Sequence, residues 1–221
     1  MAWAVEHHVE PAGAFHGRTF PEGGTRAVWR CTATKPAIVL GSTQKDGVVD
    51  QRAAAAAGLD IVRRQSGGGV VLVDSSLLWV DVLLPSGDPL WESDVGRSSL
   101  WLGSAWSDAF ASLGVATRMH EGALQRTRWS ASICFAGLAP GELVDEEGRK
   151  VLGISQRRTR AGARFQCAAL GAWDPVALAA LLCLTPEDRG VASVELAQLA
   201  AATAAPADEL FASLLTHLPA S

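Results

Sequence analysis

The segment Arg63-Arg64-Gln65-Ser66-Gly67-Gly68-Gly69 is the most distinctive in this 221-residue chain, and apolar runs lie on both sides of it. Leu59 to Val62 predicts a short strand before it, and Val70 to Val73 and Leu77 to Leu84 predict two strands after it. Three consecutive glycines lose much backbone freedom on folding, which is typical of a tight turn, a ligand that touches bare backbone or an anion-binding nest of amides. The segment is therefore either a glycine-rich hairpin turn or a ligand-binding loop, and the adjoining arginines favour the loop.

The composition narrows the function classes. A hydrophobic content of 48% with eight tryptophans is enough for a substantial core, and a net charge of −4 argues against a general nucleic-acid binder. No apolar run reaches the length of a membrane span, and the charged first twenty residues are unlike a signal peptide. The cysteines include no C-x-x-C pair and are expected to be free thiols: Cys31, Cys134, Cys167 and Cys183. We therefore expect a cytoplasmic protein with no membrane or nucleic-acid partner.

The rest of the chain predicts an α+β fold. Further strands are predicted over 27–31, 37–41, 132–135, 141–144, 149–156 and 164–170. Helices are predicted over 49–57, over 93–113 with Ser93 as the cap, from Asp174-Pro175, over 193–203 and over 207–217. Residues 1–26 predict a loose N-terminal segment with at most one edge strand, and residues 118–128 a polar loop over a site. These elements predict one domain over 1–221, a largely antiparallel or mixed β-sheet with flanking helices, which ends in the helices of 174–221.

A second candidate stretch is Gly148-Arg149-Lys150-Val151-Leu152-Gly153-Ile154-Ser155-Gln156. The glycine segment itself matches no common phosphate loop, since no Gly-Lys-Ser/Thr follows and the next element is a strand. Lys150 is one of only three lysines, against sixteen arginines, and it begins a predicted strand. It is either a solvated lysine on an edge strand or a group that binds a carboxylate or phosphate and stabilises charge during acyl or nucleotidyl transfer. Gly153 would leave room for a ligand beside that strand.

These two stretches resemble motifs of one family. Arg63 to Asp74 resembles the "RRxSGGGAVxHD" segment of lipoate–protein ligases, and Gly148 to Gln156 resembles the "GRKxxGxxQ" segment of the same family. Ile38 to Gln44, "IVLGSTQ", is similar to the strand and turn before the family's first helix. Because order and spacing agree as well, the resemblance covers roughly Val28 to Leu170. It implies the fold that the catalytic domains of biotin and lipoate ligases share.

The resemblance also implies a reaction. Lipoate or octanoate would be activated with ATP and Mg²⁺ to an acyl-adenylate and then transferred to a lysine of a lipoyl carrier domain, either a 2-oxoacid dehydrogenase E2 or a glycine-cleavage H protein. Lys150 would contact the carboxylate and the bridging phosphate, and Asp74 would lie at the nucleotide. The acid would lie against a set of substrate-binding residues: Gln44, Arg64, Ser66, Gly67, Gly68, Gly69 and Gly153. The histidines show no ligand spacing, so we expect no metal-ligating residues in the chain.

The sequence departs from the family pattern in three places. Val73 stands where the family usually has His, and Ser75-Ser76-Leu77 replaces the usual Leu-Gly-Asn, so an Asn expected near nucleotide and metal is missing. We also expect no accessory C-terminal domain. These departures favour acyl binding over adenylation, and they leave open a non-catalytic acyl- or carrier-binding protein.

An ATP-independent transferase is a further alternative. Cys134-Phe135 lies sixteen residues before Lys150, which resembles the arrangement in cysteine-dependent octanoyltransferases. A thiolate at Cys134 could attack a thioester, whereas the plain interpretation is a core cysteine. Cys167 is expected to be core. The basic run predicts a solvated face or a docking surface for an acidic carrier domain, and comprises Arg157, Arg158, Arg160 and Arg164.

Overall fold

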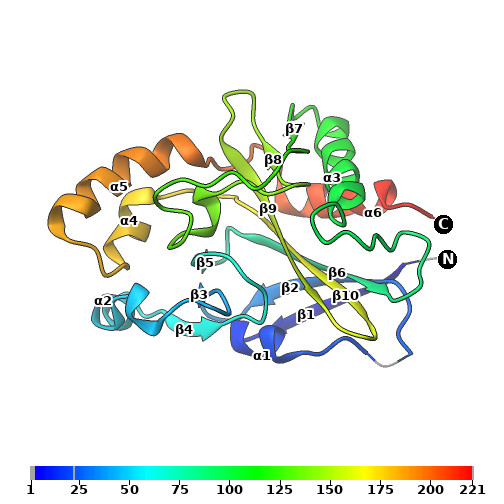
Figure 1. The fold of residues 1–221 in the computed structure, drawn as a ribbon, viewed down its shortest axis with the longest axis horizontal. Coiled ribbons are helices and arrows are strands. Elements are labelled where there is room, and N and C mark those ends of the chain that lie inside the picture. The colour runs from blue at the N-terminus through cyan, green and yellow to red at the C-terminus, as the bar shows by residue number, and fades with distance from the viewer. Residues whose placement is uncertain (1–2, 22, 221) are drawn as a thin grey trace.

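The computed structural model describes residues 3–21 and 23–220, which form two β-sheets with helices at both ends (Figure 1). The strands are β1 (Ala4–Glu10), β2 (Ala27–Ala33), β3 (Ala37–Leu40), β4 (Asp60–Arg63), β5 (Val71–Val73), β6 (Leu78–Pro85), β7 (Arg118–Met119), β8 (Leu143–Val144), β9 (Lys150–Arg158) and β10 (Gly162–Ala169). The α-helices are α1 (Ala12–Gly17), α2 (Gln51–Ala56), α3 (Leu100–Ser112), α4 (Pro175–Ala180), α5 (Pro186–Leu199) and α6 (Ala207–His217). The predicted α+β class is confirmed.

The larger sheet has seven strands in the order β1-β2-β6-β10-β9-β8-β7, and the smaller has the order β4-β3-β5. Neighbours in the larger sheet are antiparallel except for the parallel pair of β1 and β2. In the smaller sheet, β3 is parallel to β4 and antiparallel to β5. Both sheets are therefore mixed. The strands on either side of the glycine segment pair with β3 and not with each other, so that segment is a crossover and the hairpin interpretation is wrong.

Clusters of buried apolar side chains hold these layers together. The larger sheet packs against α3 and α6 through residues such as Val82, Trp106 and Leu214, while α2, α4 and α5 gather beside β3 at the opposite end (Figure 1). A third cluster joins the sheets, with Val39 and Val73 of the smaller one packed against Trp79 of the larger one. The space between the two sheets is where the cavity described below lies.

The N-terminal segment is more ordered than its sequence predicts. The edge strand is present as β1, whose register with β2 runs from Ala4 opposite Ala27 to Glu10 opposite Ala33. A short helix, α1, follows and buries Phe15 and His16. The buried positions of α1 are three and four residues apart, which is a helical pattern too short to stand out in a single sequence.

Three predicted elements differ clearly from the structure. Helix α3 begins at Leu100 and not at Ser93, because an Asp94 turn with Gly96 occupies the intervening residues. Residues 132–135 form no strand, because Ser132 and Ile133 both donate their N–H groups to the carbonyl of Trp129 and a 3₁₀ turn follows. Helix α5 begins at Pro186, where the Thr185 hydroxyl accepts the N–H of Asp188, a capping pattern that the sequence does contain.

Candidate active site

Arg64 braces the glycine segment. Its guanidinium donates to the carbonyl oxygens of Gly67 and Gly69, both at 2.8 Å from Nη2, and the side chain is buried. The preceding arginine, Arg63, binds the turn after β3 through the carbonyl oxygens of Gly41 and Gln44. The two arginines thus shape the loop, and the charge of Arg64 faces backbone oxygen atoms.

The glycines at positions 68 and 69 are required by the backbone itself. Gly68 has a φ of +100°, and a Cβ on Gly69 would come within 2.6 Å of the backbone nitrogen of Cys134. Gly67, in contrast, is exposed and has open space where its Cβ would be. The close approach of the loop to residues 133 and 134 places Cys134 beside it.

Lys150 is buried at 3% exposure in β9, between β8 and β10, so the interpretation as a solvated edge-strand lysine is wrong. Its Nζ lies 2.6 Å from Glu142 Oε2 and also donates to the carbonyl oxygens of Cys134 (3.2 Å) and Gly137 (3.0 Å). Glu142 is buried too, and accepts the N–H groups of Ala139 and Ile154. These contacts fix the position of the Lys150 ammonium group.

Sequence reasoning missed Glu142. The available signal was an acidic residue within the otherwise apolar predicted strand 141–144, eight positions before Lys150. Antiparallel pairing of β8 with β9 brings the two side chains together.

A cleft of about 900 Å³ opens above these groups. Its lining includes the three glycines, Gln44, Cys134, Glu142 and Lys150. Gln44 closes one side, because its amide accepts the N–H of Gly41 and donates to the carbonyl oxygens of Ala131 and Ser132. The structure therefore brings most of the predicted site residues to one cleft.

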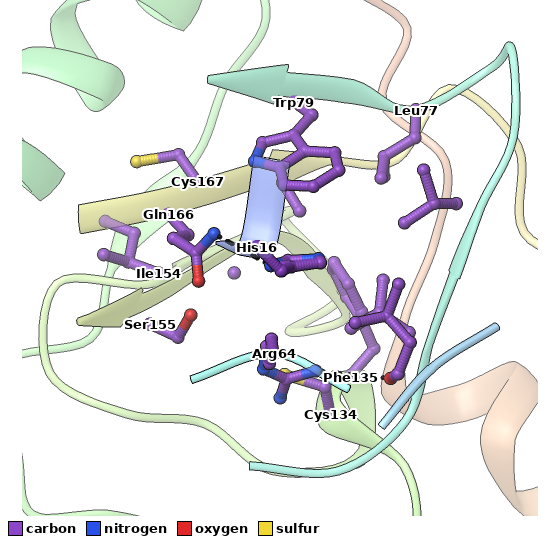
Figure 2. Close-up of a pocket in the computed structure, with 15 residues that line it drawn as sticks. His16, Arg64, Leu77, Trp79, Cys134, Phe135, Ile154, Ser155, Gln166 and Cys167 are labelled. Atoms are coloured by element: carbon purple, nitrogen blue, oxygen red, sulfur yellow. Dashed lines mark hydrogen bonds between the residues drawn. The ribbon is translucent and has the colours of Figure 1, made fainter. Parts of the chain in front are cut away.

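An apolar cavity of about 50 Å³ adjoins the cleft, and Figure 2 shows the residues that line it. Cys134, Ile154 and Ser155 line both spaces. Phe135 and Gly153 line the cavity, and they lie against the lysine: Lys150 Nζ is 5.1 Å from the centre of the Phe135 ring, and a Cβ on Gly153 would be 3.6 Å from Nζ. The ammonium group thus lies where cleft and cavity meet.

Ser66 supports the cavity wall from behind. Its hydroxyl donates to Gln166 Oε1 and hydrogen-bonds to the Ser155 hydroxyl, each at 3.0 Å. It is buried, and the cavity lining includes its two partners. Ser66 consequently links the glycine segment to β9 and β10.

The segment from Val73 to Leu77, in which the sequence departs from the family motif, lies partly at the cavity and partly at a separate hollow. Val73 and Leu77 line the apolar cavity, where they contribute hydrocarbon surface. Asp74 lines a different hollow beside Trp173, and its Oδ1 accepts from the N–H and hydroxyl of Ser76. The structure does not bring Asp74 to the cleft that Lys150 lines.

His16 is a second residue that sequence reasoning missed, because it comes from the supposedly loose N-terminal segment. It lines the cavity, stacks on Trp79 with ring centres 4.7 Å apart and contacts Gln166. Burial, reinforced by the positive charges of Arg164 and Arg64, lowers the pKa of His16 from 6.5 to about 3. The imidazole is therefore neutral at physiological pH.

Cys134 is distinct from the other thiols. All four cysteines are free, as predicted, but Cys31 and Cys167 are buried, and desolvation raises the pKa of each above its usual range. Cys183 is exposed. Cys134 is half-buried and lines both the cleft and the cavity.

The basic run is only partly a solvated face. Arg164 is buried and pairs with Asp81, where burial raises the pKa of the carboxyl and the guanidinium opposes that rise. Arg158 donates to the carbonyl oxygens of Glu92 and Ser93 and lies over Trp91, whereas Arg160 is exposed. The prediction of one solvated strand face is therefore wrong for Arg164.

Within residues 3–21 and 23–220, no group of three or more His, Cys, Asp or Glu side chains could hold a metal ion. No helix in that same part of the chain is long and apolar enough to cross a membrane.

The model of the lipoyl protein ligase A/B catalytic domain matches residues 16–211, and the chain belongs to this family. No curated protein matches the sequence.

Several solved structures share the fold at low sequence identity. A bipartite lipoate protein ligase of Thermoplasma acidophilum, from a study that includes its E2 lipoyl domain, has a TM-score of 0.79 at 17% identity over 98% of this chain and 82% of that one. A lipoate-protein ligase A bound with ATP has a TM-score of 0.73 at 17% identity over 98% and 84%. A putative lipoate protein ligase from Thermoplasma acidophilum with bound lipoic acid has a TM-score of 0.72 at 17% identity over 98% and 84%.

Proposed function

We propose that this protein is an enzyme of the lipoate–protein ligase type. It activates lipoate or octanoate, with ATP and Mg²⁺ as co-substrates. It then transfers the acyl group to a lysine of a lipoyl carrier domain. The carrier is the E2 of a 2-oxoacid dehydrogenase or the glycine-cleavage H protein. The observation that carries the proposal is the position of the Lys150 ammonium, where a large cleft meets an apolar cavity.

The geometry suits an acid with a hydrocarbon chain. The chain would enter the cavity between Phe135, Val73 and Leu77, and its carboxylate would then lie at Lys150. The nucleotide would occupy the cleft, where Gly67, Gly68 and Gly69 offer a wall without side chains. Binding would widen the cavity, since ligand pockets usually measure about 300–1,000 Å³.

The proposed reaction has two steps. First, a carboxylate oxygen attacks the α-phosphorus of ATP, an acyl–O–P bond forms, and pyrophosphate leaves. Second, the neutral amine of the carrier lysine attacks the acyl carbon, and AMP leaves as an amide forms and the amine loses a proton. Lys150 would stabilise the negative charge on the carboxylate and on the bridging phosphate oxygen in both steps.

The relatives support the same reaction. One structure with this fold holds ATP, another holds lipoic acid, and a third belongs to a system with an E2 lipoyl domain. A nucleotide role for Asp74 is a separate proposal with its own test, because Asp74 lines a different hollow from the cleft. If Asp74 contacts ATP, Asp74→Asn raises the KM for ATP while the KM for the acid stays the same.

The test of the proposal is intact-protein mass spectrometry of a lipoyl carrier domain. One reaction contains lipoate or octanoate with ATP and Mg²⁺, and the other contains an octanoyl-carrier thioester without ATP. We expect the carrier domain to gain the acyl mass in the first reaction. If it gains no mass there, the ligase proposal is wrong.

A second candidate, an octanoyltransferase, is favoured by one observation. Cys134 Sγ would lie 3.6 Å from a Cβ on Gly68, and the cysteine lines both cleft and cavity. Acyl transfer would form a thioester on Sγ, release the donor thiol and then pass the acyl group to the carrier lysine. Acylation in the ATP-free reaction, with an acyl adduct on this protein that Cys134→Ala abolishes, would support it. If neither reaction proceeds and the acid still binds, the protein is a non-catalytic acyl-binding protein.

A further inference from the structure

The apolar cavity contains one polar group whose hydrogen-bonding capacity is unused. His16 is 6% exposed, and its Nε2 is buried with no hydrogen-bond partner among residues 3–21 and 23–220. The ring stacks on Trp79, which holds its plane, and Figure 2 shows it among the lining residues with Gln166 on one side. The cavity is otherwise lined mostly by hydrocarbon, so this nitrogen is conspicuous there.

The neighbours of His16 determine which ring nitrogen carries the proton. The Oε1 of the Gln166 amide accepts the Ser66 hydroxyl at 3.0 Å. The Nε2 of Gln166 therefore donates on the other side, where His16 Nδ1 lies 3.3 Å away. An Nδ1 that accepts leaves the proton of a neutral imidazole on Nε2.

The ring is held neutral by its surroundings. Arg164 and Arg64 are the charged groups that act on it, and both disfavour a second proton. Nε2–H is thus a fixed, neutral donor on the wall of the cavity. A purely hydrocarbon chain in the cavity leaves this buried donor without a partner, whereas a chain that carries an acceptor can pair with it.

The donor lies away from the opening toward the cleft. Cys134, Ile154 and Ser155 line both spaces, whereas His16 and Trp79 line the cavity but not the cleft. An acid whose carboxylate is at Lys150 would therefore present the far part of its chain to His16. This step rests on the proposed function, since it takes the orientation of the acid from it.

We propose that the substrate is a medium-chain acid that carries a hydrogen-bond acceptor, an oxygen or sulfur atom, near the end remote from its carboxylate. His16 Nε2–H donates to that atom and makes it a determinant of specificity. A saturated, unsubstituted chain such as octanoate is then the poorer ligand. Lipoate, whose ring sulfur atoms are weak acceptors, lies between octanoate and an oxygen-bearing acid.

The test is calorimetric binding of matched acids to the full chain. The ligands are octanoate, octanoate with one ketone oxygen near its methyl end, and lipoate. We expect the ketone acid to bind about tenfold more tightly than octanoate, the effect of one net hydrogen bond. Equal affinity of the wild-type protein for the two acids overturns the inference.

His16→Phe keeps an aromatic ring against Trp79 and removes the donor. We expect it to abolish the preference for the ketone acid while octanoate binds at least as well as before. His120→Phe is the matched control, since His120 lies outside the cavity and its imidazole hydrogen-bonds to the nearby Ala123 carbonyl oxygen. A preference that persists in a folded His16→Phe protein also overturns the inference, and if this variant does not fold, the wild-type comparison alone decides.

Failure of this inference is distinguishable from failure of the proposed function. If octanoate and the ketone acid bind equally and the carrier domain is still acylated, the ligase proposal stands and the role of His16 is wrong. If neither acid binds, both are wrong.

Discussion

The cleft and the cavity differ in whether their polar groups already have hydrogen-bond or ion-pair partners within the protein. In the cleft, Lys150 has three oxygen partners and Glu142 has three donors. In the cavity, the Nε2–H of His16 has no acceptor in the part of the chain that the structure describes. Lys150 and Glu142 are already paired with each other before any ligand arrives, whereas the buried ring nitrogen of His16 has no partner in the described part of the chain.

The difference has a consequence for substrate binding. A carboxylate or phosphate that approaches Lys150 must share the ammonium with Glu142, so part of its attraction is offset by the existing pair. An acceptor that reaches His16 displaces no protein group. The cleft therefore holds a positive charge at a fixed position, where a ligand competes with Glu142. In the cavity, a ligand atom that binds His16 breaks no existing ion pair or hydrogen bond.

The largest expected effect is on stability. Lys150→Met leaves the Glu142 carboxylate buried without its counter-charge, and breaking a buried pair in this way costs about 3–5 kcal/mol of the free energy of unfolding. The double variant Glu142→Gln with Lys150→Met leaves no buried charge and should recover much of that loss. Urea unfolding of wild type, both single variants and the double variant measures this. If the double variant loses as much free energy of unfolding as the two single variants together, Lys150 and Glu142 do not act as a pair.

The next effect is on catalysis. The double variant, once shown to be folded, should lose about 10²–10³-fold in kcat, or about 3–4 kcal/mol of transition-state stabilisation, because no cation is left at the junction of cleft and cavity. Glu142→Gln alone is the control, since it retains Lys150. Steady-state acylation of the carrier domain measures both, and wild-type turnover in the double variant would exclude Lys150 from the site.

Two glycines of the same segment should differ in how much stability the protein loses when each is replaced by alanine. Gly69→Ala should lower the free energy of unfolding by about 1–3 kcal/mol, because its Cβ would overlap the backbone of residues 133 and 134. Gly67→Ala should be neutral, since its Cβ enters open space. Denaturant unfolding of the two variants distinguishes them, and equal losses would show that the loop is less closely packed than described.

The pH dependence of stability follows from His16. Its pKa is lowered from 6.5 to about 3 in the folded protein, so between these values the unfolded chain binds a proton that the folded protein does not. The free energy of unfolding should therefore fall as the pH falls from 6.5 toward 3, by at most about 1.4 kcal/mol per pH unit from this residue. His16→Phe should be less sensitive to pH across that window. The same slope in both proteins would mean that His16 is not held neutral.

The smallest expected effect is at Cys134. If the ligase proposal is right, Cys134→Ala should change ATP-dependent acylation by less than about twofold, because the thiol takes no part in bond formation. Loss of that activity in a folded Cys134→Ala protein would show that the thiol takes part in the ATP-dependent reaction and would contradict this expectation.

The sequence predicted the features that lie in short contiguous stretches. The glycine segment, Lys150 and the helix from Ala207 to His217 were identified because a motif, a rare residue or a helical period lies within a few positions. The strand predicted over 132–135 was wrong, because the close approach of Gly69 to residues 133 and 134 determines the backbone there.

The partners of the site could not be predicted in the same way. Gln166 lies 150 positions after His16, and only the packing of α1 against the larger sheet brings the two together. Motif matching also gave no information on the direction of side chains, which is why Asp74 faces Ser76 and a separate hollow although its motif matches. Local pattern identified Lys150, and tertiary structure determined what surrounds it.

The measurement that most directly tests whether the acid is activated at Lys150 is acid-dependent exchange of labelled pyrophosphate into ATP, because exchange reports the adenylation step alone. We predict exchange by the wild-type protein that requires lipoate or octanoate, no change in Cys134→Ala, and a loss of at least about a hundredfold in the folded double variant Glu142→Gln with Lys150→Met. Absence of exchange in the wild-type protein, or undiminished exchange in the double variant, would contradict the account.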